Sequence, residues 1–302
     1  MASYSGRQLG LVPPSKEPEK YIKASGPNGW WAILEEMIRM SFGHEIKEFA
    51  KSLGSDLVGI ASSDSELLRD NNASIETILP DCRSLVVIAK RLNGDAISSG
   101  NIKIAQYDTI CTYQELDLIM HKVTWHLKEN GYRAVSIPPN MPIDFSPEKR
   151  GMYGEVNQKC AAAAAGLGNI GINRLFLSPE FGPFLRMGSI LTNADLKADE
   201  PLKESVCTKC MECVKKCPTG AIGEDGSLDL GKCMRISLQY GLPGVAKFGM
   251  KATILKEDEL KAHLGSPILW ELWQNLLIGN FNNCFECINA CPIGKNKRTK
   301  AP

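Results

Sequence analysis

The chain has 302 residues, with 35 basic and 34 acidic side chains and a formal net charge of +1. This balance excludes the overall positive field that nucleic-acid-binding proteins use, and the length allows one large or two smaller domains. The N-terminal stretch MASYSGRQLGLVPPSKEPEK has neither a secretory signal nor a twin-arginine pair. No apolar run reaches the roughly 18 residues needed to cross a bilayer. We therefore expect a soluble, cytoplasmic protein without a membrane span.

Predicted helices and strands alternate up to about residue 195, after an arm at 1–27 that is rich in Pro, Gly, Ser and Lys. The patterns predict, in chain order, helices at 30–40 and 45–53, strands at 56–61 and 84–90, a helix at 112–130, a strand at 132–137, a helix at 158–165 and a strand at 184–192. The apolar run that begins at Ser84 suits a strand buried on both faces, and Gly131 is a good C-terminal stop for the long helix. This order predicts an α/β layer domain, which we place at residues 28–200.

The segment from Gly166 to Gly171 reads Gly-Leu-Gly-Asn-Ile-Gly and fits the pattern G-x-G-x-x-G. A dinucleotide-binding fingerprint needs a strand before it and an acid about twenty residues after it. Here an alanine run at 161–165 precedes it and favours a helix. Two interpretations stay open: a turn whose glycines let the backbone approach a large flat ligand, and a purely structural turn.

Eight of the 11 cysteines lie in two runs near the C-terminus. The first run is Cys207, Cys210, Cys213 and Cys217, followed by Pro218; the second is Cys233, Cys284, Cys287 and Cys291, followed by Pro292. This spacing is typical of bacterial ferredoxins with two [4Fe-4S] clusters, in which the fourth cysteine of a run ligates the other cluster. We therefore assign Cys207, Cys210, Cys213 and Cys291 to cluster one, and Cys217, Cys233, Cys284 and Cys287 to cluster two.

Two other uses of these cysteines fit the sequence less well. Zinc sites take their ligands in two separated pairs, and a third cysteine in the first run breaks that pattern. Disulfides form in oxidising compartments, and we expect none here. The cysteine-bearing part is predicted to be a ferredoxin-like domain at 201–302, with a hairpin at 221–228 and a helical insertion at 234–283. The other cysteines, Cys82, Cys111 and Cys160, are expected to be small buried hydrophobes.

Several segments together resemble the epoxyqueuosine reductases, and the resemblance spans roughly residues 45–292. The opening of that family is similar to EIKEFAKSLG at 45–54 followed by LVGIA at 57–61. Its central signature is similar to AGLGNIG at 165–171, SPEFG at 178–182 and GSILT at 188–192, and the first cysteine run completes the pattern. The same signatures occur in corrinoid-dependent reductive dehalogenases.

The resemblance implies a nitroreductase-like α/β domain that binds cobalamin base-off, followed by the domain with two clusters. The clusters would reduce the cobalt to Co(I), which would cleave or reduce a C–O or C–halogen bond. A reduced ferredoxin or flavodoxin would supply the electrons. The chain has no Asp-x-His-x-x-Gly motif for a lower ligand, which fits base-off binding without a protein histidine and equally fits a protein without a corrinoid. The cofactor-binding residues implied are Gly166, Leu167, Gly168, Gly171, Asn173 and Arg186.

Electrons alone do not complete a reduction, so an acid must protonate the product. The candidates are Tyr107, Tyr113, Asp144, Glu155 and Lys159. A tyrosine near a basic residue can act in this way, and so can a carboxylic acid whose pKa is raised by burial. The resemblance favours Tyr107 and Asp144, and we take Tyr113 as the third catalytic candidate.

The chain departs from the epoxyqueuosine reductases in three places. Their acid lies shortly before AGLG, whereas Asp144 precedes Ala165 by about twenty residues. Their Asp-Tyr-His is replaced by Thr112-Tyr113-Gln114, and no helical-repeat extension follows Pro292. We therefore expect a reductase for a small-molecule substrate, with tRNA epoxyqueuosine reduction as the first alternative. An electron-transfer protein or activator without a substrate of its own is the second.

Overall fold

The computed structural model describes residues 30–144, 146–149, 151–278 and 283–297, so the arm expected at 1–27 lies outside the described residues. The α-helices are α2 (Trp30–Ser52), α3 (Asn72–Ile78), α4 (Gly94–Ser98), α5 (Ile102–Glu129), α6 (Gln158–Ala164), α7 (Glu212–Lys215), α8 (Leu230–Ser237), α9 (Leu242–Ala252), α10 (Glu257–Leu264), α11 (Pro267–Ile278) and α12 (Glu286–Ala290). The 3-10 helices are η1 (Glu66–Asn71) and η2 (Lys295–Lys297). The strands are β1 (Leu57–Ser62), β2 (Ser84–Arg91), β3 (Ala134–Ile137), β4 (Asn169–Ile170), β5 (Phe176–Leu177) and β6 (Leu185–Thr192).

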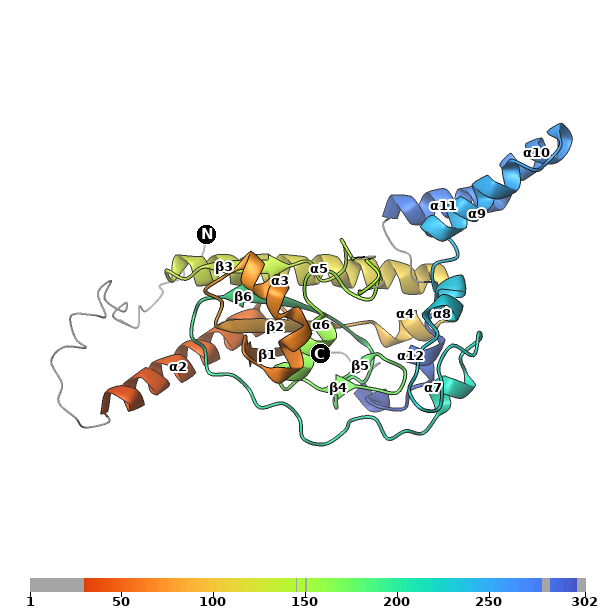
Figure 1. Cartoon of the computed structure of the whole chain (residues 1–302). Coiled ribbons are helices and arrows are strands. Elements are labelled where there is room, and N and C mark those ends of the chain that lie inside the picture. Colours follow the sequence, from red (N-terminus) through yellow and green to blue (C-terminus); the bar gives the residue numbers. More distant parts are fainter. Residues whose placement is uncertain (1–29, 145, 150, 279–282, 298–302) are drawn as a thin grey trace, which may run out of the picture.

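A four-stranded sheet in the order β1-β2-β6-β3 forms the centre of the molecule (Figure 1). All three pairings are antiparallel, and Val86 of β2 lies opposite Ile60 of β1 and Ile190 of β6. The four strands expected in this region are confirmed, with ends shifted by one or two residues. β4 and β5 form a separate two-stranded hairpin.

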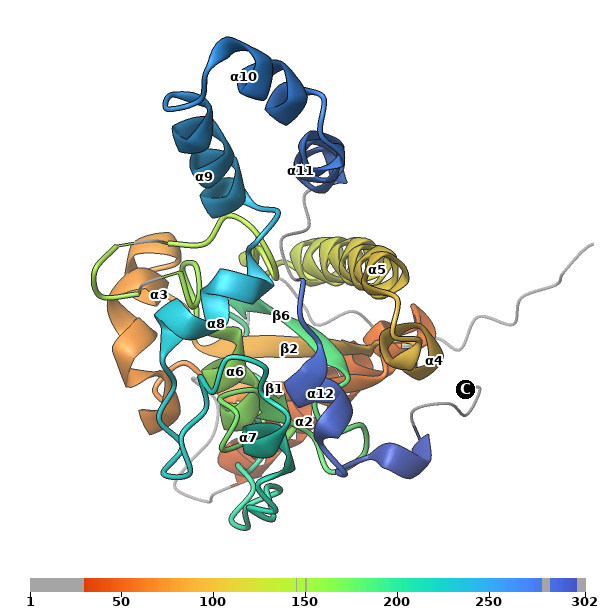
Figure 2. The same ribbon diagram turned by 90° about the vertical axis from the view of Figure 1, so that its right-hand side faces the viewer.

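Helices cover both faces of the sheet, with α5 on one side and α6 on the other (Figure 2). Alternate residues of β2 point to opposite faces. Val86 packs in a core cluster with Ile46 of α2 and Leu116 of α5, whereas Val87 packs in another with Ala162 of α6. This explains the uninterrupted apolar run of β2 and confirms an α/β layer arrangement.

Two helices differ from the sequence prediction. Residues 30–52 form the single helix α2 rather than two helices. Gly43 is tolerated inside it because a Cβ there would lie 3.2 Å from the Ile60 side chain, so glycine lets the helix pass close over β1. α5 begins ten residues earlier than expected, because the side chain of Asn101 accepts hydrogen bonds from the backbone N–H groups of Lys103 and Ile104. At its other end, Gly131 follows with φ of +87°.

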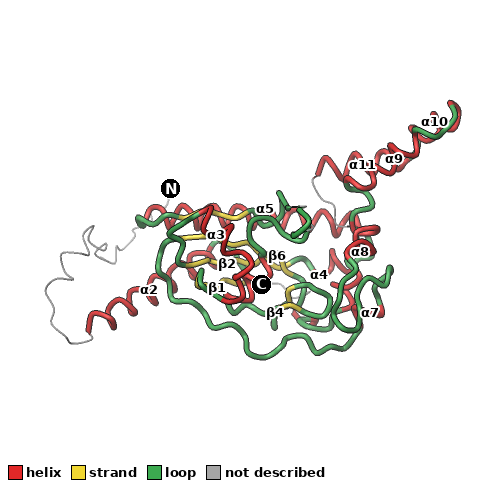
Figure 3. The backbone as a smooth tube through the Cα atoms, in the orientation of Figure 1, coloured by secondary structure: helices red, strands yellow, loops and turns green. Residues whose placement is uncertain are grey.

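The cysteine-bearing segments gather at one end of the sheet. A long loop, residues 193–211, leads there from β6 (Figure 3), and Asp199 fixes it by accepting hydrogen bonds from Lys47 Nζ (2.5 Å) and Ile60 N (2.8 Å). The expected hairpin at 221–228 is present as a bridge between Ile222 and Leu228, with a turn at Gly226.

Three helices of the expected insertion, α9, α10 and α11, project away from that end (Figures 1 and 2). Lys103 of α5 holds α11 through a 2.6 Å ion pair with Glu271. Among the described residues, no helix is both long and apolar enough to cross a membrane. The boundaries of the two predicted domains, 28–200 and 201–302, stay a prediction.

Candidate functional site

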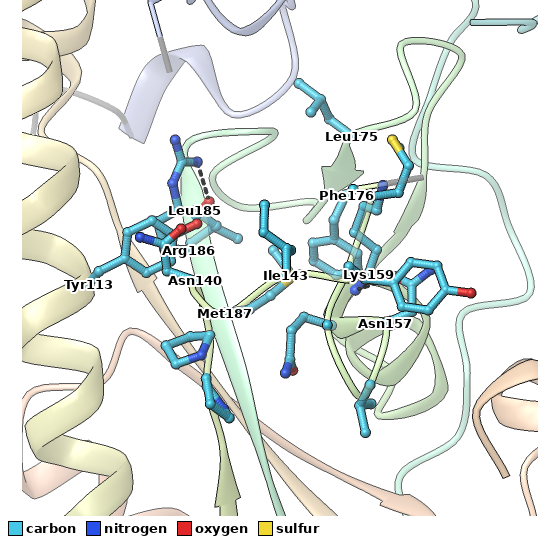
Figure 4. Close-up of a pocket in the computed structure, with 18 of the residues that line it drawn as sticks. Tyr113, Asn140, Ile143, Asn157, Lys159, Leu175, Phe176, Leu185, Arg186 and Met187 are labelled. Carbon is cyan, nitrogen blue, oxygen red and sulfur yellow. Dashed lines mark hydrogen bonds between the residues drawn. The ribbon is translucent and has the colours of Figure 1, made fainter. Parts of the chain in front are cut away.

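A cavity of about 300 Å³ lies between α5, β6 and the start of α6. Figure 4 shows Tyr113 and Arg186 on one side of it and Lys159 on the other. The loop 138–154 contributes Asn140 and Ile143 to its wall. The structure therefore brings together a phenol, a guanidinium and an ammonium group from three separate elements.

Arg186 and Tyr113 form one side of this cavity. The guanidinium lies over the Tyr113 ring, 5.6 Å from its centre, and Nη1 donates to the Leu185 carbonyl at 3.0 Å. Nε of Arg186 is buried without a hydrogen-bond partner. Burial raises the pKa of the nearby Asp108 carboxyl, although Asn93 N–H and the charge of Arg186 oppose that rise. Arg186 thus keeps hydrogen-bonding capacity for a ligand.

The first turn of α6 forms the opposite side. Asn157 caps this helix by accepting from the backbone N–H groups of Lys159 and Cys160, which fixes the backbone of Lys159. Its Nζ donates to the Arg174 carbonyl at 3.2 Å, and burial lowers the pKa of its ammonium group. Lys159 therefore releases a proton more readily than a solvated lysine. Both amide atoms of the neighbouring Gln158 are buried without partners.

Asp144 stabilises the loop beside the cavity. Its carboxylate accepts from Ser146 N at 2.7 Å and lies 3.2 Å from Lys149 Nζ. The Ser146 N–H first and the Lys149 ammonium second hold the pKa of Asp144 below its ordinary value. These partners favour the charged form, so Asp144 does not have here the burial-raised pKa expected of a proton donor, and its catalytic role stays a prediction. Glu155 is exposed.

Tyr107 is also on α5, but it does not line the cavity. Its side chain is 71% exposed, and a hydrogen bond with Cys111 raises the pKa of its phenol. Of the three catalytic candidates, the structure thus brings only Tyr113 into the cavity.

The glycine segment 166–171 packs against the protein itself. A Cβ at Gly166 would lie 2.5 Å from the Glu200 carbonyl oxygen, and one at Gly168 would lie 2.0 Å from that of Leu177. At Gly171 it would lie 2.6 Å from the Leu177 side chain, and Leu167 packs against the core. These contacts explain why glycine is needed at 166, 168 and 171 and favour the structural turn, while the assignment of the four residues to cofactor binding stays a prediction. Of the other two implied residues, Arg186 lines the cavity, whereas Asn173 lies beside the cysteines.

The cysteines converge in two sets. A small cavity is lined by all four residues assigned to cluster one: Cys207, Cys210, Cys213 and Cys291. In the other set, the pKa of the Cys287 thiol is raised to about 12, mainly by burial. The neighbouring cysteines add to this rise: they are the assigned partners Cys284, Cys233 and Cys217, and also Cys213.

These placements suit iron–sulfur clusters. Among the described residues, no group of three or more His, Cys, Asp or Glu side chains is arranged to hold one metal ion. Cubane ligands lie further apart than the ligands of one ion, because each thiolate binds a different iron. A buried thiol remains protonated until a metal replaces its proton. Both sets of cysteines are therefore compatible with one [4Fe-4S] cluster each, and the assignment of ligands to the two clusters stays a prediction.

A second, largely apolar cavity of about 750 Å³ lies beside Cys233, one of the cysteines assigned to cluster two. Cys233 and Met234 of α8 and the following Leu238 line one side of it, and Met141 and Ile143 of the loop line another. Ile143 and Gly151 line both cavities. The second cavity therefore adjoins the cavity of Tyr113, Lys159 and Arg186.

Comparisons with known proteins agree with this arrangement. The family described as "4Fe-4S binding domain" matches residues 201–223. The epoxyqueuosine reductase of Gloeobacter violaceus is 28% identical over 218 residues, which are 63% of this chain and 64% of that protein. The Bacillus subtilis enzyme is 23% identical over 276 residues, 84% of this chain and again 64% of that protein. The chain thus spans slightly less than two thirds of these relatives.

Solved structures show the same fold. A crystal structure of epoxyqueuosine reductase with an epoxyqueuosine-modified tRNA-Tyr stem loop has a TM-score of 0.56 and 22% identity, covering 85% of this chain and 66% of that one. A catabolic reductive dehalogenase in complex with 3-bromo-4-hydroxybenzoic acid has a TM-score of 0.50 and 22% identity, covering 64% and 28%. The resemblance to this superfamily of reductases is confirmed.

Proposed function

We propose that the chain is an oxidoreductase with two [4Fe-4S] clusters and a corrinoid, and that it reduces epoxyqueuosine in tRNA. The observation that carries this proposal is the pair of adjoining cavities, one lined by Cys233 and the other by Tyr113, Lys159 and Arg186, with Ile143 and Gly151 in the walls of both. The relatives named epoxyqueuosine reductase favour the tRNA substrate over the small-molecule substrate that we expected from the sequence.

The residues present fit the implied cofactors. The two sets of cysteines would hold the clusters, and the apolar walls at Met141, Leu238 and Leu242 would hold a flat macrocycle. The α/β layers would be the nitroreductase-like part that carries it. When bound and reduced, a corrinoid supplies electrons to a C–O or C–halogen bond, and the clusters supply electrons to the corrinoid one at a time.

The chain's own residues would bind the substrate and deliver protons. Arg186 has a buried Nε without a hydrogen-bond partner, so it would bind an oxygen of the substrate. Lys159 would donate a proton, because burial favours its neutral form. Tyr113, with a cation over its ring, is the second donor candidate. The half-buried Asp108 carboxylate would hold Arg186 in place through its charge.

A small halogenated aromatic acid is the second candidate substrate. It is favoured by the fold shared with the reductive dehalogenase that binds 3-bromo-4-hydroxybenzoic acid. It is also favoured by the cavity of about 300 Å³, which is in the size range of small-molecule sites, and by its two cationic side chains.

The test is anaerobic conversion by protein produced with a corrinoid supply. Reduced methyl viologen serves as the donor, and the substrates are a tRNA stem loop with epoxyqueuosine and 3-bromo-4-hydroxybenzoic acid. Mass spectrometry should show loss of the epoxide oxygen from the nucleoside. Lys159→Met should abolish conversion, whereas the exposed Lys122→Met should not. Cobalt-free protein that converts neither substrate would overturn the proposal and favour an electron-transfer protein.

A further inference from the structure

We propose that the loop around Cys210 is the docking surface for an acidic electron-donor protein of the ferredoxin or flavodoxin class. This inference rests on the proposed function and adds the place where electrons enter. It assigns cluster one to the protein surface and cluster two to the catalytic cavity.

Exposure distinguishes the two sets of cysteines. Among the eight assigned cysteines Cys210 alone is exposed; Cys213 and Cys291 of the same set are buried, and all four cysteines of cluster two are half-buried. Cys233 of cluster two lines the cavity that leads to the candidate active site. Lys209 and Met211 on either side of Cys210 both have positive φ, +53° and +62°. These backbone angles turn the loop sharply and leave Cys210 at its tip.

Charge also distinguishes the two sets. Residues 203–216 carry four lysines and two glutamates, which gives +2. Lys215 pairs with Glu212 at 2.9 Å. The other three lysines, Lys203, Lys209 and Lys216, are exposed. We call these three the lysine collar; no ion pair within the described ranges involves any of them.

Lys216 of the collar also lies near cluster two, since it precedes Cys217 and lines a cavity with Cys284. The other charges near the cluster-two cysteines balance, Lys232 and Arg235 against Asp229 and Glu286, and Lys232 lies 3.6 Å from Asp229. An acidic protein is therefore attracted to the surface of the lysine collar, where Cys210 is the exposed cysteine. RNA could also bind lysines, but its binding gives no reason for an exposed cluster ligand at the centre of the positive patch.

The electron transfer itself balances simply. The donor is oxidised by one electron and cluster one is reduced by one electron, and no bond forms or breaks. Docking matters because the rate depends on how often the donor's acidic surface reaches Cys210. Surface charges act on this step by raising the association rate, by about 10- to 1,000-fold, with a strong dependence on salt.

The test uses the cluster-loaded protein and the double variant Lys209→Glu/Lys216→Glu, with Lys122→Glu on the exposed face of α5 as the matched control. Calorimetry with an oxidised acidic ferredoxin should show at least tenfold weaker binding by the double variant at low salt. Stopped-flow bleaching of the clusters by reduced ferredoxin and by reduced flavodoxin should slow by a similar factor. Both losses should disappear near 0.5 M salt, where screening is strong.

Three controls keep the result specific. Reduced methyl viologen should reduce both proteins equally fast, and turnover with viologen as donor tests the proposed function separately. The charge-removing Lys209→Gln/Lys216→Gln should show a smaller effect in the same direction, with unchanged iron content. Equal ferredoxin binding by wild type and the double variant would overturn the inference. Loss of tRNA stem-loop binding alone, with normal reduction by the donor, would also overturn it and assign the collar to RNA.

Discussion

The glycine segment gives the sharpest test of how the cofactor is held. At Gly166, φ is +70° and a Cβ would lie 2.5 Å from the Glu200 carbonyl oxygen. Gly166→Ala therefore carries two costs. The left-handed conformation costs about 1–2 kcal/mol for a non-glycine residue, and the backbone shift that relieves the contact costs about 1–3 kcal/mol more.

Gly100 is a matched control because it shares the backbone angle and lacks the contact. Its φ is +72°, and nothing lies within 4 Å of a Cβ placed there. Gly100→Ala should therefore cost only the conformational part, about 1–2 kcal/mol. Since 1 kcal/mol shifts the midpoint by about 2–4 °C in domains of 150–250 residues, Gly166→Ala should melt several degrees below Gly100→Ala.

The assay is thermal unfolding followed by circular dichroism, with corrinoid binding measured separately by absorbance. If the segment is a structural turn, Gly166→Ala melts lower than Gly100→Ala and still binds corrinoid in the folded state. Equal melting of the two variants, combined with lost corrinoid binding by Gly166→Ala alone, would refute this reasoning. The segment would then be a ligand-binding turn after all.

Three further predictions concern the clusters and the cavity. Cys207→Ala and Cys217→Ala should each remove about half of the iron, because they belong to different clusters; full iron in either variant would contradict the ligand assignment. Burial lowers the pKa of Lys159, so proton donation by its ammonium is lost, and kcat falls, as pH rises through that lowered pKa. Lys159→Arg should lower kcat strongly and remove this alkaline limb, because a guanidinium does not release its proton; an unchanged alkaline limb in the variant would exclude Lys159 as donor. Asp144 has a lowered pKa through Ser146 and Lys149, so its stabilising effect is complete above the ordinary aspartate pKa and disappears as pH falls through the lowered one. Wild type should accordingly unfold at higher temperature than Asp144→Asn at pH 7 and at the same temperature in strong acid, while the pH profile of kcat stays unchanged.

Elements that depend on a few neighbouring residues were predicted well from the sequence. The way in which distant elements come together was predicted poorly. The apolar β-branched run of β2 and the stop at Gly131 are encoded within a few residues, so those elements were found. The start of α5 was missed because it depends on one cap, Asn101. The gathering of Tyr113, Arg186 and Lys159 could not be derived, since it depends on antiparallel pairings between distant strands.

The candidate site shows the same division. Spacing alone predicted two sets of cysteines; the four of cluster one line one small cavity, and Cys287 has as neighbours its three assigned partners and also Cys213. Sequence reasoning missed Gln158 and Asp108, because nothing in the chain marks a residue whose importance comes from burial. A weak signal was available for Gln158, which begins α6 directly before the candidate Lys159. The G-x-G-x-x-G pattern alone could not separate a ligand-binding turn from a structural one, because a close approach of backbone to backbone requires the same glycines.

The loop 138–154 contributes to the walls of both the cavity beside Cys233 and the cavity of the candidate proton donors. Its residues Ile143 and Gly151 line both cavities, so any shift of the loop changes both at once. Asp144 holds the loop from outside the cavities, through Ser146 and Lys149, and Lys149 also donates to the Gly154 carbonyl at 2.9 Å. Removing the Asp144 charge should therefore weaken substrate and corrinoid binding together, whereas removing Lys159 should lower kcat and leave corrinoid binding intact. Measured on the same protein samples, these two patterns separate a positioning carboxylate from a proton donor.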